Sequence, residues 1–184
     1  MKGVVIAGGF IRAYYAGEVP SDMDLYFETK DQCQEACTLL RNAEWKQVYE
    51  TKEATSFTKN NKIVQVISFI NGGAEEILSK FDFTVCQVAI DGIEKNSADE
   101  LKGILLMHND FFEHLASRLL VFTNSSRPLS SLKRVIKYIK RGYSICDGNI
   151  IRIARAIAVT VDFSDPEALR KHTAGFNSEI RAID

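Results

Sequence analysis

The stretch "AGGFIRAYYAGEVPSDMDLYF", residues 7–27, holds a glycine pair and an aspartate pair that together decide the fold. Gly8 and Gly9 follow an apolar run and precede a short helical pattern. Past a Pro-Ser turn, Asp22 and Asp24 alternate with apolar residues. Such alternation is typical of a half-buried strand, in which residues i and i+2 face the same side. We therefore expect both carboxylates on one face of a strand, near a glycine turn.

The aspartate pair points to a divalent cation. Two neighbouring carboxylates repel and raise each other's pKa, and a bound cation removes that cost. Oxygen ligands suit Mg²⁺ or Mn²⁺, which usually keep several waters and add substrate phosphates. For an Asp-x-Asp pattern taken alone, a solvated outer strand face is the alternative.

The glycine pair points to phosphate. Gly8 and Gly9 stand between a strand and a helix, where backbone N–H groups and the helix N-terminus receive anions. Arg12 lies one turn into that helix, within reach of the same anion. A simple tight turn explains a glycine pair alone, but phosphate donors beside a carboxylate pair form a more specific combination.

The bulk composition narrows the classes of partner. The chain has 184 residues, 46% of them hydrophobic, enough for one domain or two small ones. Its formal net charge is −1, so any surface that binds nucleic acid must be local. The apolar run at the start is too short for a signal peptide, and no run approaches the about 18 residues of a membrane span. We therefore expect a cytoplasmic protein with no membrane partner.

The four cysteines, which are scattered, are expected to be reduced. Cys33 and Cys37 lie one helical turn apart, and we interpret them as small packing residues, with half of a zinc site as the lesser alternative.

Periodicity predicts an α+β protein, mixed for about the first hundred residues and helical from about Leu101 onward. Expected strands are 4–7, 22–28, 45–50, 55–58, 63–69 and 81–90, the last closed by the Asp91-Gly92 turn. Expected helices are 10–16, 30–43, 74–78, 110–120, 129–141, 149–159 and 166–172. With no linker of low complexity between them, the two halves are expected to pack together.

Residues 8–27 resemble the head motif of nucleotidyltransferases related to CCA-adding enzymes and bacterial poly(A) polymerases. The positions that match are Gly8, Gly9, Arg12, Gly17, Asp22 and Asp24. Ala13 replaces the aspartate that usually follows the arginine.

Two later stretches resemble motifs of the same family, in the same order. "FDFTVCQVAID", residues 81–91, matches at Asp82, Phe83, Thr84 and Ala89 if one residue is inserted, with Lys80 and Phe81 in place of two arginines. "RPLSSLKRVIKYIKRGYSI", residues 127–145, resembles the helix that carries Arg-x-x-Arg-Phe, here Arg134, Lys137 and Tyr138. The helix with which the family selects bases is not found, and the chain lacks room for the long segments that grip tRNA.

The resemblance implies a polymerase-β-like mixed sheet with helices, in a compact phage-type member. It implies a head over residues 1–100 and a helical domain over residues 101–184. The implied reaction moves a nucleoside monophosphate from ATP or another triphosphate to an acceptor hydroxyl, most simply on a tRNA-like RNA, inside a bacterial or phage-infected cell. Asp22 and Asp24 are implied as the catalytic residues that hold Mg²⁺ or Mn²⁺. The implied nucleotide-binding residues are Gly8, Gly9, Arg12, Ser21, Asp82, Arg134 and Lys137.

The segment 127–141 supports an anionic partner independently, because it contains no acidic residue. On a helical projection one arc is cationic and the other is apolar. The cationic arc is Lys133, Arg134, Lys137, Lys140 and Arg141, and the apolar arc is Leu132, Val135, Ile136, Ile139 and Tyr143. The cationic arc suits a triphosphate or an RNA backbone, and a solvated helix face is the alternative.

Other functions remain open at this point. Many polymerase-β-like enzymes carry a third carboxylate on a neighbouring strand, where this chain offers Gln65 and Ser68. A catalytically silent protein that binds a nucleotide or RNA is therefore one alternative. A transferase that acts on a protein or a small molecule is another.

Overall fold

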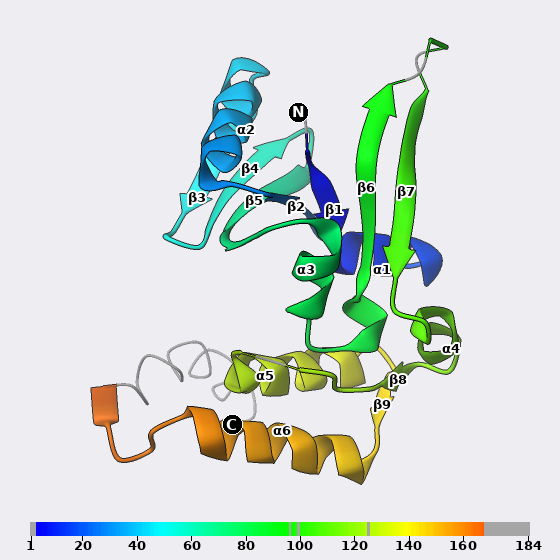
Figure 1. Cartoon of the computed structure of the whole chain (residues 1–184), viewed down its shortest axis with the longest axis vertical. Coiled ribbons are helices and arrows are strands. Elements are labelled where there is room, and N and C mark those ends of the chain that lie inside the picture. Colours follow the sequence, from blue (N-terminus) through cyan, green and yellow to red (C-terminus); the bar gives the residue numbers. More distant parts are fainter. Residues whose placement is uncertain (1–2, 96, 99, 125, 168–184) are drawn as a thin grey trace.

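A seven-stranded mixed sheet forms the centre of the molecule (Figure 1). The computed structural model describes residues 3–95, 97–98, 100–124 and 126–167. The strands are β1 (Val5–Ala7), β2 (Met23–Phe27), β3 (Lys46–Glu50), β4 (Ala54–Lys59), β5 (Lys62–Asn71), β6 (Val88–Lys95) and β7 (Leu101–Met107). Their order across the sheet is β3-β4-β5-β2-β1-β6-β7. Only the pairing of β2 with β5 is parallel among these neighbours.

The register of the central strands brings the two predicted motifs together. β1 runs antiparallel to β2, with Val5 opposite Tyr26 and Ile6 opposite Leu25. The end of β1, which leads into Gly8, therefore lies beside the start of β2, which carries Asp24. On the other side of β2, Asp24 is in register with Gln65 of β5.

Helices cover the two faces of the sheet with separate apolar cores. Helix α2 (Lys30–Asn42) begins with a capping box formed by Thr29 and Gln32. Its buried stripe is Cys33, Ala36, Cys37 and Leu40, which includes the two cysteines predicted as packing residues. This stripe packs on Leu25 and Phe27 of β2. Helix α3 (Ala74–Ser79) packs in the core that contains Tyr26, which shares a face of β2 with Asp24.

A second layer of helices lies beside the sheet, and α3 lies between the sheet and this layer (Figure 1). Helix α1 (Gly9–Tyr15) follows β1. The later elements are η1 (Thr84–Cys86), α4 (Phe111–Ala116), β8 (Leu119–Leu120), α5 (Pro128–Ile139), β9 (Ser144–Ile145) and α6 (Asp147–Thr160). Their core includes Ile11 of α1 and Val88 of β6, so it joins the helical layer to the sheet.

Two expectations about the strands are wrong. Strand signals do not vanish at residue 101, because β7 pairs with β6 to complete the sheet. The strand expected over 81–90 begins only at Val88, because the N–H groups of Cys86 and Gln87 bond back to Phe83 and Thr84 and form a 3₁₀ turn. Gly92, with φ +58°, marks a shift in register inside β6 rather than its end.

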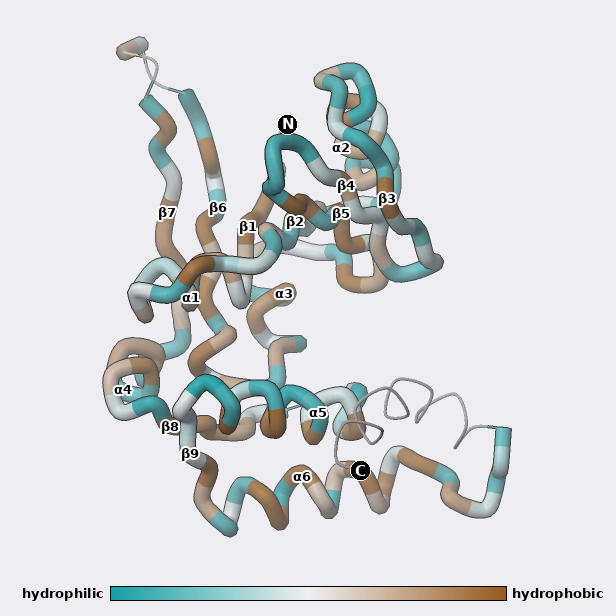
Figure 2. Tube along the Cα trace, turned by 180° about the vertical axis from the view of Figure 1, so that it is seen from behind, coloured by the Kyte–Doolittle hydropathy of each residue, from teal (hydrophilic) through white to brown (hydrophobic). Residues whose placement is uncertain are grey.

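Helix α5 is amphipathic, as Figure 2 shows by its mixed colours, but it is rotated from the expected orientation. Its buried residues are Pro128, Ser131, Val135 and Tyr138. Ile136 and Ile139, expected in the core, are 40% and 51% exposed. The rotation follows from Tyr138, whose ring packs on Phe83 and Tyr143 and whose hydroxyl lies 3.0 Å from Cys86 Sγ. The helix expected over 166–172 lies mostly outside the described residues, and within the described part no helix is long and apolar enough to cross a membrane.

Candidate functional site

A pocket of about 310 Å³ lies between the central strands and α5. Such a volume is at the lower end of the range for small-molecule sites. All nine residues predicted for the site line it: Gly8, Gly9, Arg12, Ser21, Asp22, Asp24, Asp82, Arg134 and Lys137. The three motifs, spread over about 130 residues of sequence, therefore meet in one place.

Asp24 lies in β2, Asp22 directly precedes this strand, and both line the pocket. Ser21 Oγ donates a hydrogen bond to Asp22 Oδ1. Asp24 is more enclosed, and its Oδ1 is buried without a hydrogen-bond partner among the described residues. Burial, and secondarily the Asp22 carboxylate, raises the pKa of Asp24 to about 7, while Lys137 acts in the opposite direction. A buried carboxylate oxygen without a partner is an open position for a cation.

Gly8 and Gly9 contribute to the pocket in different ways. Gly8 has φ +84°, a conformation that residues with a side chain rarely adopt, and a Cβ there would lie 3.0 Å from Phe81 Cε2. Its N–H donates to the carbonyl of Val88, so Gly8 contributes shape rather than a free donor. Gly9 begins α1, where first-turn N–H groups have no partner inside the helix, and a Cβ there would meet nothing within 4 Å.

Arg12 lies in the wall of the pocket rather than at its mouth. Its Nη2 donates to Glu18 Oε2 over 2.8 Å, and its Nη1 donates to Tyr143 Oη over 3.2 Å. The guanidinium also packs over the rings of Tyr138 and Tyr143. Burial acts to lower the pKa of Arg12, but the bond to Glu18 and the two tyrosines outweigh it, so the pKa is raised overall. Arg12 therefore remains charged and ties α1 to the helical layer.

Asp82 pairs with an arginine and does not cap a turn with its side chain. Its Oδ2 accepts a hydrogen bond from Arg134 Nε over 2.8 Å, and its side chain is 4% exposed. The resemblance implies that both Asp82 and Arg134 are nucleotide-binding residues. The pair places one buried anion and one half-exposed cation between the sheet and α5.

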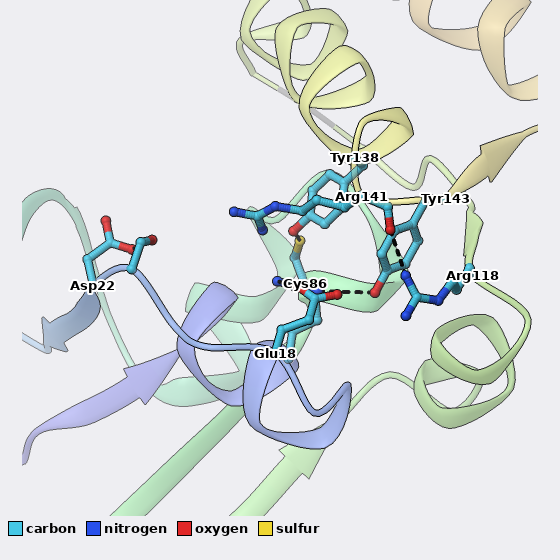
Figure 3. A network of polar contacts seen from close by, with 9 residues as sticks. Glu18, Asp22, Cys86, Arg118, Tyr138, Arg141 and Tyr143 are labelled. Atoms are coloured by element: carbon cyan, nitrogen blue, oxygen red, sulfur yellow. Dashed lines mark hydrogen bonds and ion pairs between the residues drawn. The ribbon is translucent and has the colours of Figure 1, made fainter.

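One face of α5 carries a stripe of polar residues along the pocket. We call Arg127, Ser130, Arg134, Lys137 and Arg141 the α5 stripe. Their spacing of three or four residues keeps them on one side of a helix. Arg141 extends its guanidinium toward the side of the pocket where Asp22 lies (Figure 3). The site prediction had left out Arg127, Ser130 and Arg141, although the 3-4-3-4 spacing from Arg127 would have found them.

The pocket residues fit a divalent cation at Asp22 and Asp24. The buried, partnerless Oδ1 and the mutual repulsion of the two carboxylates are what a cation would relieve. The described residues contain no group of three or more His, Cys, Asp or Glu side chains arranged for a metal. On the neighbouring strand the residue in register with Asp24 is Gln65, so any cation has two protein carboxylates.

Comparisons with known proteins give two kinds of similarity. The first is in sequence: the family model described as "Gabija anti-defense 2 family protein" matches residues 1–118. A curated relative, "Gabija anti-defense 2" of Bacillus phage SPbetaL7, is 36% identical over 154 residues, which are 81% of this chain. The chain spans only 36% of that relative's length.

The second is in structure. A Thermotoga maritima CCA-adding enzyme complexed with tRNA superposes with a TM-score of 0.62 at 20% identity, over 92% of this chain and 41% of the enzyme. A CCA-adding enzyme with ATP superposes with a TM-score of 0.62 at 17% identity, over 92% of this chain and 42% of the enzyme. A tRNA nucleotidyltransferase with a primer tRNA and an incoming ATP analog superposes with a TM-score of 0.59 at 15% identity, over 93% of this chain and 52% of that protein. These likenesses confirm the predicted fold class, a nucleotidyltransferase-like mixed sheet with helices.

Proposed function

The chain belongs to the Gabija anti-defense 2 family, and from that premise we propose that it is a metal-dependent nucleotidyltransferase. In this proposal it moves a nucleoside monophosphate from a nucleoside triphosphate to an acceptor hydroxyl. One observation supports it above all: a pair of carboxylates with a buried, partnerless oxygen faces a cationic helix across one pocket.

Each group in the pocket has a task in this reaction. The oxygen of the acceptor hydroxyl bonds to the α-phosphorus and its proton passes to water, while the bond from the α-phosphorus to the α–β bridging oxygen breaks and pyrophosphate leaves. Lys137 and Arg141 offset the negative charge of the triphosphate, and the first turn of α1 donates N–H groups to it. Mg²⁺ or Mn²⁺ held by Asp22 and Asp24 would supply Lewis-acid stabilisation of the oxygens that react.

The Asp82–Arg134 pair is assigned to the ribose, and Arg12 is assigned to positioning. Asp82 and Arg134 line the same pocket as Asp22 and Asp24, and their hydrogen bond lies at the middle of α5, where a sugar would follow phosphates held at Lys137. Arg12 already bonds Glu18 and Tyr143, so it holds α1 in place rather than meeting the phosphates. Most of the rate enhancement would come from positioning and electrostatics.

The proposed acceptor is an RNA in the cytoplasm of a phage-infected cell, and ATP is the first donor to test. The basic segment 127–141 and the likeness to enzymes solved with tRNA support this acceptor. The family's name and the relative from a Bacillus phage support a role against a host defence, so a protein of that defence is the alternative acceptor.

A catalytically silent nucleotide-binding protein is the second candidate. The observation that favours it is Gln65, an uncharged residue in register with Asp24 where related enzymes carry a carboxylate. Such a protein would bind the triphosphate without releasing pyrophosphate.

Incubation with each α-labelled triphosphate, Mg²⁺ and extracts of infected cells, followed by separation of RNA, protein and small molecules, tests the proposal. We expect label in the RNA fraction with wild type and none with Asp22→Asn plus Asp24→Asn. Label in the protein fraction would move the acceptor to a protein. Binding without transfer to any fraction would favour the silent protein, and transfer by the double variant would overturn the assignment of the aspartates.

A further inference from the structure

An exposed aromatic ring lines the pocket beside the start of α5. Phe69 of β5 lines the pocket and is 45% exposed. The guanidinium of Arg127 packs over its ring, 4.6 Å from the centroid. Arg127 is held in turn by Glu53, with Nη1 and Oε2 2.6 Å apart. We call Phe69 and Arg127 the aromatic platform.

The α5 stripe fixes the order of the groups along the pocket. Arg127 stands at the start of α5 beside Phe69, Arg134 bonds Asp82 in the middle, and Lys137 interacts with Asp24. Ten residues separate Arg127 from Lys137, about 15 Å along a helix. That length suits one nucleoside triphosphate laid along α5, with its phosphates at Lys137.

Arg127 is poorly placed to be a phosphate ligand. Its charge is offset by Glu53 and its guanidinium lies over the Phe69 ring, whereas Lys137 acts on Asp24. Arg141 extends toward the side of the pocket where Asp22 lies (Figure 3). A large apolar ring left open in a pocket, backed by a guanidinium plane, is the chemistry that stacks a base.

We propose that Phe69 and Arg127 form the nucleobase subsite, and that it selects purine triphosphates by stacking area. The inference rests on the proposed function, because it assumes that a triphosphate occupies the pocket. Stacking without a defined set of hydrogen bonds tolerates every base. A two-ring purine nevertheless buries more apolar area against the Phe69 ring than a one-ring pyrimidine does. ATP and GTP are therefore expected to bind more tightly than CTP and UTP.

Calorimetric titration with ATP, CTP and inorganic tripolyphosphate, all with Mg²⁺, tests the subsite in the full chain. Phe69→Ala should weaken ATP binding about fivefold to a hundredfold, from the usual strength of stacking on an aromatic ring. Its affinity for tripolyphosphate should stay at the wild-type value, because no phosphate contact is lost. Phe112→Ala is the matched control, since Phe112 is 48% exposed but does not line the pocket.

A second variant gives an optical signal that does not depend on the stability of the alanine variant. The chain has one tryptophan, Trp45, which packs with the core under α2. In Phe69→Trp, we expect ATP to quench the added fluorescence and tripolyphosphate to leave it unchanged. Equal quenching by ATP and tripolyphosphate, or unchanged ATP affinity in Phe69→Ala, would overturn the base subsite. Nucleotide transfer by the wild type would still support the proposed function in that case. A wild type that binds neither ATP nor tripolyphosphate would overturn both.

Discussion

Asp24 is the residue whose surroundings say most about the site. Its carboxylate is enclosed, faces Asp22 and has an oxygen without a partner, so the folded protein disfavours its charged form. Gly8 is the complementary case, because its backbone rather than its side chain is fitted to the pocket. Both positions give predictions that separate folding from ligand binding.

The stability of the protein without metal should depend on Asp24 between about pH 4 and pH 7. The pKa of Asp24 rises from 3.8 to about 7 on folding. An acid with a raised folded-state pKa is favourable to folding at low pH, and this contribution is lost as pH rises toward the folded pKa. Asp24→Asn should therefore raise the Tm at pH 8 by several degrees and have a smaller effect at pH 5, since about 2–4 °C correspond to 1 kcal/mol at this size.

Thermal unfolding of Asp24→Asn at both pH values, with a chelator present, measures this difference. Glu35→Gln, which removes an exposed carboxylate on α2, is the control, and it should change the Tm equally at pH 5 and pH 8. An equal change in Tm at pH 5 and pH 8 for Asp24→Asn would contradict the assignment.

Alanine at Gly8 and alanine at Gly9 should have different consequences. Gly8→Ala forces a side chain into positive φ and against Phe81, so we expect a loss of about 1–2 kcal/mol in the free energy of unfolding. Gly9→Ala has open space and should leave stability unchanged, while its Cβ obstructs phosphate at the first turn of α1. Urea denaturation and Mg²⁺-ATP titration of both variants measure the two effects. Unchanged ATP affinity in Gly9→Ala would place the triphosphate elsewhere.

At the scale of elements, α5 serves two purposes with its two sides. Val135 and Tyr138 fix it in the core, and the α5 stripe faces the pocket. Lys140 is exposed and lies outside the pocket, so a cation of the same helix is available as a comparison.

The cations of α5 should differ in their contribution to binding of a polyanion. Replacing Lys137 and Arg141 by Gln should weaken Mg²⁺-ATP binding and flatten its dependence on salt, because each cation that contacts a phosphate steepens that dependence. Lys140→Gln should leave both unchanged. Affinity measured at several salt concentrations decides this, and an equal effect of Lys140→Gln would reduce the stripe to a general surface charge.

The elements up to α3 were predictable because their signals are local. Asn60 and Asn61, both with positive φ, turn the hairpin between the expected strands, and Cys33 and Cys37 of α2 are buried as expected. β7 was missed because its sequence, "LKGILLM", has no alternation and contains a glycine, so only pairing with β6 makes it a strand. The aromatic platform was missed for a related reason, because no local sequence pattern indicates that Phe69 lies next to Arg127.

At the scale of the whole molecule, the pocket is shared between the sheet and the helical layer. The predicted division at residue 100 remains a prediction about domains, but β7 extends the sheet to Met107 and the largest core contains residues from both parts. Arg12 is the buried charged group that links α1 to Tyr143.

Loss of Arg12 should therefore destabilise the whole chain. Removing one member of a buried ion pair typically costs about 3–5 kcal/mol, and we expect Arg12→Met to fall near the lower value because Glu18 is partly exposed. Arg12→Met plus Glu18→Gln should recover part of the loss, since no carboxylate is then left without its partner. Urea denaturation of the single and double variants measures this. A double variant no more stable than Arg12→Met would show that packing, not charge, dominates.

The pairing of Gln65 with Asp24 has a consequence for the phage that encodes such a protein. Glutamine and glutamate codons differ only in their first base, so one point mutation would place a third carboxylate beside the other two. The same mutation would add a negative charge next to an aspartate that already resists ionisation. Phage that encode such a protein can therefore sample both forms of the site, and the transfer activity of Gln65→Glu measured beside wild type reports which charge count the proposed reaction favours.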